Sequence, residues 1–462
     1  MKRSLIANAI LILGLLQINI PLEGSAQSTK NGWTPLFDGK TLKGWKAVGG
    51  KAPYTVENGT IVGTMTKKTP NSFLITEKEY GDFILELEVK LEGNSTNSGI
   101  QTRSQLDPNA NNGLGRVFGR QVEIDPTQRA WTGGIYDEAR RGWLYPLDLN
   151  EQAKTAYKAE QFNHVRIESV GNELKTWVND VPVAYVIDTI DSKGFIGLQV
   201  HSVPEELHGK KVYFKNIKIQ TKNLKRKDFP NDIHIVNLTS NSISEAEKKA
   251  GFKLLFNGKD SEGWRSVKSN QFPAKGWEIK DGTITVLKSD GGESTNGGDI
   301  ITIDKYSAFD LTFDFKLTPG ANSGIKYFVT LKEKTTGSAI GLEYQLLDDE
   351  KHPDAKMGRD GNRTLASLYD LKTSNRDSRA RKPIGQWNKG RIVVTKDNKV
   401  TYFLNGFKML TFERGSKEFK DLVRISKYKD WEGFGMANEG HILIQDHGDE
   451  VSFRNIKIKN LN

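Results

Sequence analysis

The sequence has 462 residues and no cysteine. Disulfide bonds, thiolate metal sites, thiol nucleophiles and lipid attachment through an N-terminal cysteine are therefore excluded. The chain also lacks a G-x-S-x-G elbow, an H-E-x-x-H helix and a phosphate-binding P-loop. Serine hydrolase, zinc protease and nucleotide hydrolase chemistry accordingly has no support in the sequence.

A block of like charge is also missing. The formal charge is +10 at pH 7, but the basic residues are spread along the chain instead of forming one arm. Scattered lysine and arginine usually belong to solvated faces, so we expect no nucleic-acid partner. After the first residues, no stretch is long and apolar enough to cross a bilayer, so we expect no membrane partner in the mature protein.

The first residues have the pattern of a secretory signal. Lys2 and Arg3 precede a mostly apolar run over residues 5–20, and Gly24-Ser25-Ala26 is a small-x-Ala cleavage site. We predict a signal peptide over residues 1–26, with export to the periplasm or the cell exterior. The alternative is an uncleaved membrane anchor, for which the apolar run is short.

A ten-residue phrase occurs twice. LFDGKTLKGW spans Leu36–Trp45, and LFNGKDSEGW spans Leu255–Trp264. Two copies of such a phrase indicate two copies of a domain. Further pairs follow in the same order: NSGI from Asn97 and Asn322, QVEID from Gln121 and EYQLLD from Glu343, GGIYDE from Gly133 and ASLYDL from Ala366, GLQVHS from Gly197 and LIQDHG from Leu443, and FKNIKI from Phe214 and FRNIKI from Phe453.

The fold is predicted to be all-β. Apolar and polar residues alternate over residues 83–91 and 309–317, which indicates sheets with one buried face, and both strands lead to the loop phrase NSGI. Many short strands separated by Gly, Asn and Asp turns favour two tandem sandwiches of jelly-roll type. We place the first at residues 27–223 and the second at 251–462. The linker, 224–250, should hold a short helix because Ser244 and Glu247 have capping-box spacing.

Taken in order, these phrases resemble the 3-keto-disaccharide hydrolase family, and the resemblance covers nearly the whole mature chain twice. It implies a concanavalin-like sandwich and action on glycosides whose C3 hydroxyl has been oxidised to a ketone. The copies are unequal. Glu343 and Gln345 in the second copy are replaced by Gln121 and Glu123 in the first, and only the second copy has the HPDAK loop that begins at His352.

A 3-keto-glycoside can be cleaved without a carboxylate pair at C1. The ketone acidifies the C2 hydrogen, so a base can form an enolate, the aglycone can leave C1, and water can add to complete a net hydrolysis. This hydrolysis or lyase-type route needs a base, an acid and positive charge or a metal near the enolate oxygen. We predict Glu343 and His352 as the catalytic residues, with Lys356 near the enolate.

The other predicted residues bind substrate or metal. The substrate-binding residues are Gln345, Asn322, Lys356, Tyr369, Gln445 and His447 in the second copy, and Arg103, Gln121, Glu123, Tyr136 and His201 in the first. Asp348 and Asp354 flank His352 and could hold one divalent ion of the calcium or manganese type; no other cofactor is expected. The alternative for each residue is a solvated or structural role in a strand or loop.

Two functions of other classes stay open. A tandem carbohydrate-binding protein without catalysis needs only amides and rings in its grooves, whereas an enzyme also needs an ionisable cluster. A cell-surface scaffold is supported by the tandem organisation alone. Glu343 together with His352 favours the enzyme.

Overall fold

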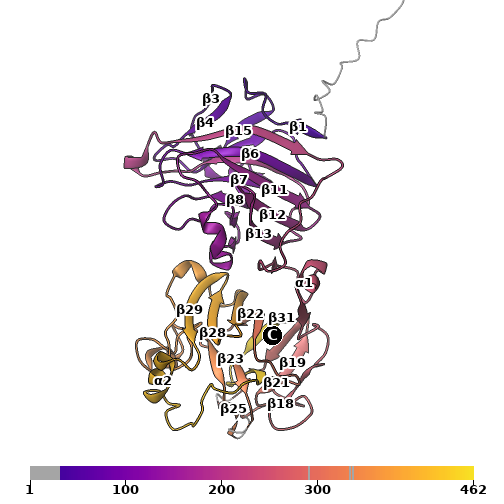
Figure 1. Ribbon diagram of the computed structural model, residues 1–462, viewed down its shortest axis with the longest axis vertical. Helices are drawn as coiled ribbons and strands as arrows, with labels where there is room; N and C mark the ends of the chain where they lie inside the picture. The colour runs from indigo at the N-terminus through magenta and orange to yellow at the C-terminus, as the bar shows by residue number, and fades with distance from the viewer. Residues whose placement is uncertain (1–31, 290–291, 332–333, 336–337, 462) are drawn as a thin grey trace, which may run out of the picture.

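The computed structural model describes residues 32–289, 292–331, 334–335 and 338–461. It confirms the all-β prediction, with two β-sandwiches stacked along the long axis of the molecule (Figure 1). The predicted signal peptide lies outside the described residues. Within the described residues, no helix has the length and apolar character that a membrane span requires.

The first domain consists of two antiparallel sheets and one parallel edge strand from the linker, β16. Along the larger sheet, the strands are β16 (Val236–Asn237), β13 (Val181–Ile187), β12 (Glu173–Val178), β11 (Asn163–Val170), β6 (Phe83–Leu91), β15 (Lys211–Gln220), β4 (Thr60–Thr64) and β3 (Tyr54–Glu57), with β1 (Trp33–Pro35) beside β15. Along the other sheet they are β10 (Gly142–Tyr145), β9 (Ile135–Glu138), β8 (Arg116–Ile124), β7 (Ser98–Asp107), β14 (Phe195–Val200), β5 (Ser72–Thr76) and β2 (Trp45–Val48).

The second domain repeats this plan. Its larger sheet has β19 (Trp277–Lys280), β20 (Thr283–Val286), β31 (Val451–Asn460), β22 (Phe309–Leu317), β27 (Asn388–Val394), β28 (Lys399–Leu404) and β29 (Phe407–Glu413), with β17 (Phe252–Leu254) beside β31. The smaller sheet has β18 (Trp264–Ser266), β21 (Ile300–Thr302), β30 (His441–Ile444), β23 (Asn322–Val329) and β26 (Leu342–Leu347), and β24 (Lys334–Thr335) pairs with β25 (Ser338–Ala339).

Helices are short in the described residues. The α-helices are α1 (Glu245–Lys249) and α2 (Lys417–Arg424), and the 3₁₀ turns are η1 (Asn111–Gly113), η2 (Leu147–Leu149), η3 (Glu151–Thr155), η4 (Glu205–Leu207), η5 (Pro353–Lys356) and η6 (Ser378–Ala380). The capping box before α1 forms as predicted, since the Ser244 hydroxyl accepts a hydrogen bond from the Glu247 amide at 3.1 Å.

The repeated LFDGK and LFNGK phrases close the start of each sandwich in the same way. The Trp45 indole N–H donates to the Leu36 carbonyl at 2.7 Å, and the Trp264 indole N–H donates to the Leu255 carbonyl at 2.6 Å. Each tryptophan is buried, so its one polar atom needs this partner. The aromatic anchor at the end of the phrase therefore fixes the loop that begins it.

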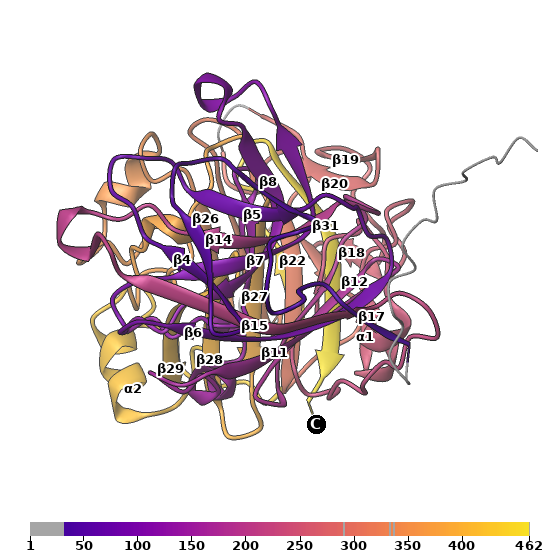
Figure 2. The same cartoon turned by 90° about the horizontal axis from the view of Figure 1, so that it is seen from above.

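The two domains meet where Trp131 and Asp148 of the first domain contact the second. Trp131 lies edge-on to Phe407, with ring centroids 5.5 Å apart, and the guanidinium of Arg379 lies 5.2 Å from the centre of the Trp131 ring. The Lys408 amide donates to Asp148 at 3.1 Å across the same boundary. Figure 2 shows the stack from above, with the first domain in front of the second.

Candidate functional site

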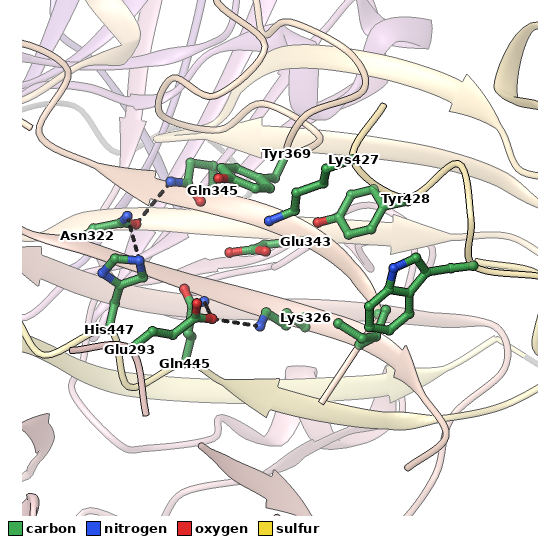
Figure 3. A pocket seen from close by; sticks show the side chains of 13 residues that line it. Glu293, Asn322, Lys326, Glu343, Gln345, Tyr369, Lys427, Tyr428, Gln445 and His447 are labelled. Atoms are coloured by element: carbon green, nitrogen blue, oxygen red, sulfur yellow. Dashed lines mark hydrogen bonds and ion pairs between the residues drawn. The ribbon is translucent and has the colours of Figure 1, made fainter. Parts of the chain in front are cut away.

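The largest group of predicted site residues lies on the outer face of the smaller sheet in the second domain (Figure 3). There, β23, β26, the end of β30 and three loops surround a cavity of about 250 Å³. The alternation along β26 explains the placement, because Glu343 and Gln345 face the cavity while Tyr344 between them packs on Phe313 in the core. The lining residues are Glu293, Asn322, Lys326, Ile340, Gly341, Glu343, Gln345, Tyr369, Lys427, Tyr428, Trp431, Gln445 and His447.

The NSGI phrase builds the floor of this cavity, and it opens strand β23 instead of forming the predicted loop. The Ser323 hydroxyl donates to the Gln445 carbonyl at 2.9 Å, which ties β23 to the end of β30. A Cβ atom on Gly324 would lie 2.1 Å from Oε1 of Glu343. Glycine is therefore needed at this position because the Glu343 side chain crosses directly over it.

Glu343 faces a lysine on the neighbouring strand. Lys326 and Glu343 are directly opposed in the antiparallel register of β23 and β26, and each is 5% exposed. Burial raises the pKa of Glu343, and the charges of Lys326 and Lys427 offset only part of this effect. For Lys326, burial lowers the pKa, but the carboxylates of Asp299, Glu343 and Glu293 outweigh it and raise the pKa overall. Lys326 therefore stays protonated, next to a Glu343 carboxyl group that is a weaker acid than an exposed glutamate.

A second lysine stands at the mouth of the cavity. The Lys427 ammonium lies 4.2 Å from the centre of the Tyr369 ring and 5.2 Å from that of Tyr428, although much of its side chain is exposed. Loss of water around this ammonium lowers its pKa, and the nearby Glu343 charge opposes the shift. In Figure 3, Lys427 and Lys326 approach Glu343 from opposite sides.

Two amides present unused acceptors to the cavity. Gln345 donates to Asn322 at 3.0 Å, and Gln445 donates to Glu293 at 2.9 Å. Oε1 of each glutamine is buried and has no hydrogen-bond partner within the described part of the chain. A buried acceptor without a partner is costly, so both atoms suit the hydroxyl groups of a bound sugar.

The one group of metal-type ligands that we find among the described residues is His352, His447 and Asp449, whose ligand atoms lie within 4.8 Å of one another. Both histidine rings already accept hydrogen bonds. Nδ1 of His352 accepts from the Asp354 amide at 3.2 Å, and Nε2 of His447 lies 3.2 Å from the Asn322 side-chain nitrogen. Each of these bonds engages one of the two ring nitrogens, so a cation held through the other nitrogen of each ring would leave the bonds in place.

Asp348 and Asp354, the predicted metal ligands, both accept hydrogen bonds from the protein. Asp348 accepts from the amides of Gly320, Glu350 and Lys351. Asp354 accepts from Arg363 and from the Tyr369 hydroxyl, both at 2.8 Å, so it orients a ring of the cavity wall. Neither aspartate joins the His352 group. Neither His352 nor Lys356 lines the cavity: the His352 ring contacts that of His447, with centroids 5.9 Å apart, and Lys356 is exposed.

The first domain has a cavity of about 240 Å³ in the equivalent place, to which Gln121, Glu123, Tyr136 and His201 contribute as predicted. Arg103, in contrast to the prediction, does not line this cavity. It sits on a bulge of β7 with φ +50°, is 2% exposed and turns away from this cavity. Its guanidinium donates to the carbonyls of Gly81, Ser169 and Gly171 and to Asp82.

Sequence reasoning missed three charged residues of the second-domain cavity. Lys326 could have been found, because it follows Asn322 and Gly324 at a spacing of two and therefore shares their face. Glu293 and Lys427 come from loops without a counterpart in the repeated phrases, so no pattern identified them.

Comparison with known proteins gives consistent matches. A family model described as a 3-keto-alpha-glucoside-1,2-lyase-like domain matches residues 32–220 and again residues 251–459. A Bacteroides thetaiotaomicron protein named 3-keto-disaccharide hydrolase is 39% identical over 230 residues, which are 45% of this chain and 78% of that protein. Two crystal structures of candidate glycosyl hydrolases from Parabacteroides distasonis are also similar. One is 31% identical and covers 48% of this chain and 100% of its own, with a TM-score of 0.42. The other is 25% identical and covers 46% and 99%, with a TM-score of 0.34.

Proposed function

The chain belongs to the 3-keto-alpha-glucoside-1,2-lyase-like family, and from this premise we propose that its second domain cleaves glycosides carrying a ketone at C3. The name of the Bacteroides thetaiotaomicron relative supports glycoside hydrolase chemistry. One observation carries the proposal: Glu343 lies with Lys326 and Lys427 in a cavity whose other walls are mostly amides and rings. A purely sugar-binding groove would not need this ionisable cluster.

In the proposed reaction, Glu343 takes the C2 proton. The C2–H electron pair becomes the C2–C3 double bond of an enolate, whose negative C3 oxygen is stabilised by the Lys326 ammonium. The enolate then re-forms the ketone, a C1–C2 double bond forms and the C1–O bond to the aglycone breaks. Lys427 gives the departing oxygen its proton, so the aglycone leaves as an alcohol.

Water then adds across the C1–C2 double bond. Neutral Lys427 takes a proton from the water as the hydroxyl joins C1, and C2 regains a proton from Glu343, which yields the free 3-keto sugar and restores both side chains. The sum of both steps is hydrolysis of the glycosidic bond. The same carboxyl group serves as base in elimination and as acid in hydration, which requires a pKa closer to neutrality than that of an exposed glutamate.

The electrostatics of the cavity support this division of roles. Burial raises the pKa of Glu343, so the group can both accept and return a proton. The carboxylates around Lys326 keep it charged, as an enolate partner must be, whereas the lowered pKa of Lys427 suits a proton donor. Where the surroundings shift the pKa values of two neighbouring groups in different directions, the shifts indicate which group acts as acid and which as base.

His352 and the divalent ion have no step in this route. The His352 ring contacts that of His447 and does not line the cavity, so we assign it to positioning His447. If an ion were bound by His352, His447 and Asp449, it would supply positive charge at the cavity edge. We retain export of the mature protein as part of the proposal, on the strength of residues 1–26.

The test is aglycone release from methyl 3-keto-α-D-glucopyranoside carrying hydrogen or deuterium at C2. We expect a primary isotope effect, or exchange of the C2 position with solvent. Turnover with the C2 deuterium fully retained and no isotope effect would leave direct displacement at C1. No aglycone release from this glycoside or from its β anomer would refute the proposed function.

A further inference from the structure

The cavity of the first domain keeps the amide hydrogen-bonding residues of the second-domain cavity, here called the frame, but differs from it in its ionisable residues. It is lined by Asn71, Asn97, Gln121, Glu123, Arg129, Tyr136, Glu138, Trp143, Gln199 and His201. The strand registers of β7, β8 and β14 match those of β23, β26 and β30, so each residue can be paired with its counterpart in the second domain. The two cavities are also of similar volume, about 240 and 250 Å³.

The hydrogen-bonding frame is the retained part. By register, Asn97, Gln199 and His201 occupy the places of Asn322, Gln445 and His447. The Ser98 hydroxyl donates to the Gln199 carbonyl at 2.7 Å, as Ser323 does to Gln445 in the second domain.

Two acceptors of this frame are unused. Gln199 is 1% exposed, and its Oε1, like Oδ1 of Asn97, is buried without a hydrogen-bond partner in the part of the chain that the structure describes. Both residues line the cavity. Amide acceptors left open toward a cavity of this size, beside the ring of Trp143, are suited to the hydroxyls and apolar face of one sugar ring.

The ionisable pair is the altered part. Gln101 and Gln121 stand in register where the second domain has Lys326 and Glu343. These amides bond to each other, with Gln101 Nε2 donating to Gln121 Oε1 at 2.6 Å, and Gln121 Nε2 donates on to Glu123 at 3.0 Å. At this position, neither a base for the C2 proton nor an ammonium for the enolate is present.

The edge of the cavity has changed as well. Val203 stands in register where the second domain has Asp449, and the first copy has no loop equivalent to that of His352. The amide frame has therefore been kept, while the opposed Lys326–Glu343 pair and Asp449 have been replaced. The charged residues that remain in this cavity stand at other positions, and Glu123 among them bonds to Gln121 and lies 3.8 Å from Arg129. Selection for a bound sugar without its cleavage would produce this pattern.

We propose that the first-domain cavity is a second sugar site that binds a 3-keto-glycoside through Asn97 and Gln199 and does not cleave it. The ligand class rests on the proposed function, since the frame is shared with the second domain. Such a site would hold substrate on the same chain that cleaves it, which raises the local substrate concentration at the second domain.

The test is calorimetric titration of the full chain carrying Glu343→Gln with methyl 3-keto-α-D-glucopyranoside. We expect two sites per chain. Adding Gln199→Ala or Asn97→Ala should weaken one of them by about tenfold, as expected for loss of one or two hydrogen bonds. Gln152→Ala, an exposed amide outside both cavities, is the matched control and should keep two sites. Circular dichroism of each variant checks that it is folded.

One site per chain, lost with Gln445→Ala and unaffected by Gln199→Ala or Asn97→Ala, would overturn the inference. It would also be overturned if the Glu343→Gln chain kept turnover that Glu123→Gln then abolished, because the first domain would be catalytic. Two binding sites without any aglycone release by the unaltered chain would instead refute the proposed function and leave the first-domain site standing as a binding site.

Discussion

The glycine of the NSGI phrase offers a matched pair of substitutions for testing the active-site assignment. Gly324→Ala would place a Cβ 2.1 Å from Oε1 of Glu343, and Gly99→Ala would place one 2.2 Å from Cδ of Gln121. Neither glycine has a φ in the left-handed region, so the backbone accepts alanine and the effect comes from the crowded side chain alone. The two variants therefore make the same steric change in two chemically different cavities.

The size of the effect follows from these distances. Real Cβ contacts are essentially never shorter than 3.0 Å, so Glu343 or Gln121 must move by about 1 Å. Overpacking of this kind costs roughly 1–3 kcal/mol. For a domain of this size, that cost corresponds to a fall in Tm of about 2–12 °C. A displacement of about 1 Å in a catalytic group can cost about 10²-fold in rate.

We therefore expect Gly324→Ala to lower kcat for aglycone release about 10²-fold, while Gly99→Ala lowers it less than threefold. Both variants should show comparable losses of Tm by calorimetry, which separates stability from chemistry. A folded Gly324→Ala chain with kcat within twofold of the unaltered protein would refute the placement of Glu343. Equal losses of kcat in both variants would show that the domains do not divide the work as argued.

The remaining predictions concern charge, pH and metal. Glu343→Gln should lower kcat by about 10²–10⁴-fold, and Glu350→Gln, in an exposed loop, should not; similar rates for both would argue against Glu343 as the base. The rate should rise with pH through the raised pKa of Glu343, which must be deprotonated, and fall where Lys427 loses its proton; a flat profile from about pH 5 to 9 would contradict both roles. Burial raises the pKa of Glu123 to about 8 from 4.5. The folded chain therefore holds a proton that the unfolded chain releases, and the unfolding free energy should fall as pH rises through this window, by at most about 1.4 kcal/mol per pH unit. Glu123→Gln should flatten that slope in urea titrations, and an unchanged slope would place the proton elsewhere. EDTA should leave turnover unchanged, because Lys326 supplies the positive charge near the enolate and no step of the proposed route uses an ion; activity lost to EDTA and restored by a divalent ion would show that the group of His352, His447 and Asp449 binds one.

Much of the fold could be predicted because strand and turn signals are local. The alternation over 309–317, the capping box at Ser244 and the anchor at Trp264 each depend on residues within about ten positions. The exchange of Glu343 and Gln345 for Gln121 and Glu123 was also readable, since period-two spacing puts both members of each pair on one face of a strand.

Site residues that were predicted because they lie close to a motif along the chain were less successful. Asp354 lies two residues from His352, but it binds Arg363 and the Tyr369 hydroxyl because the loop turns its side chain toward them. Arg103 lies three residues after the NSGI phrase, but a bulge with positive φ turns its side chain away from the cavity. Closeness along a loop says little about which way each side chain points.

Repeats and period-two alternation along the chain were sufficient to predict the two-copy β-sandwich plan, the faces of the site strands and the difference in charge between the copies. Three contacts became visible only in the folded chain: Lys326 opposes Glu343 across β23 and β26, Lys427 reaches the same cavity from a loop about 80 residues later, and the His352 ring packs against that of His447. These contacts depend on strand register and loop closure over long separations. No local pattern encodes such separations, whereas hydrogen-bonded pairing of the sheet imposes them.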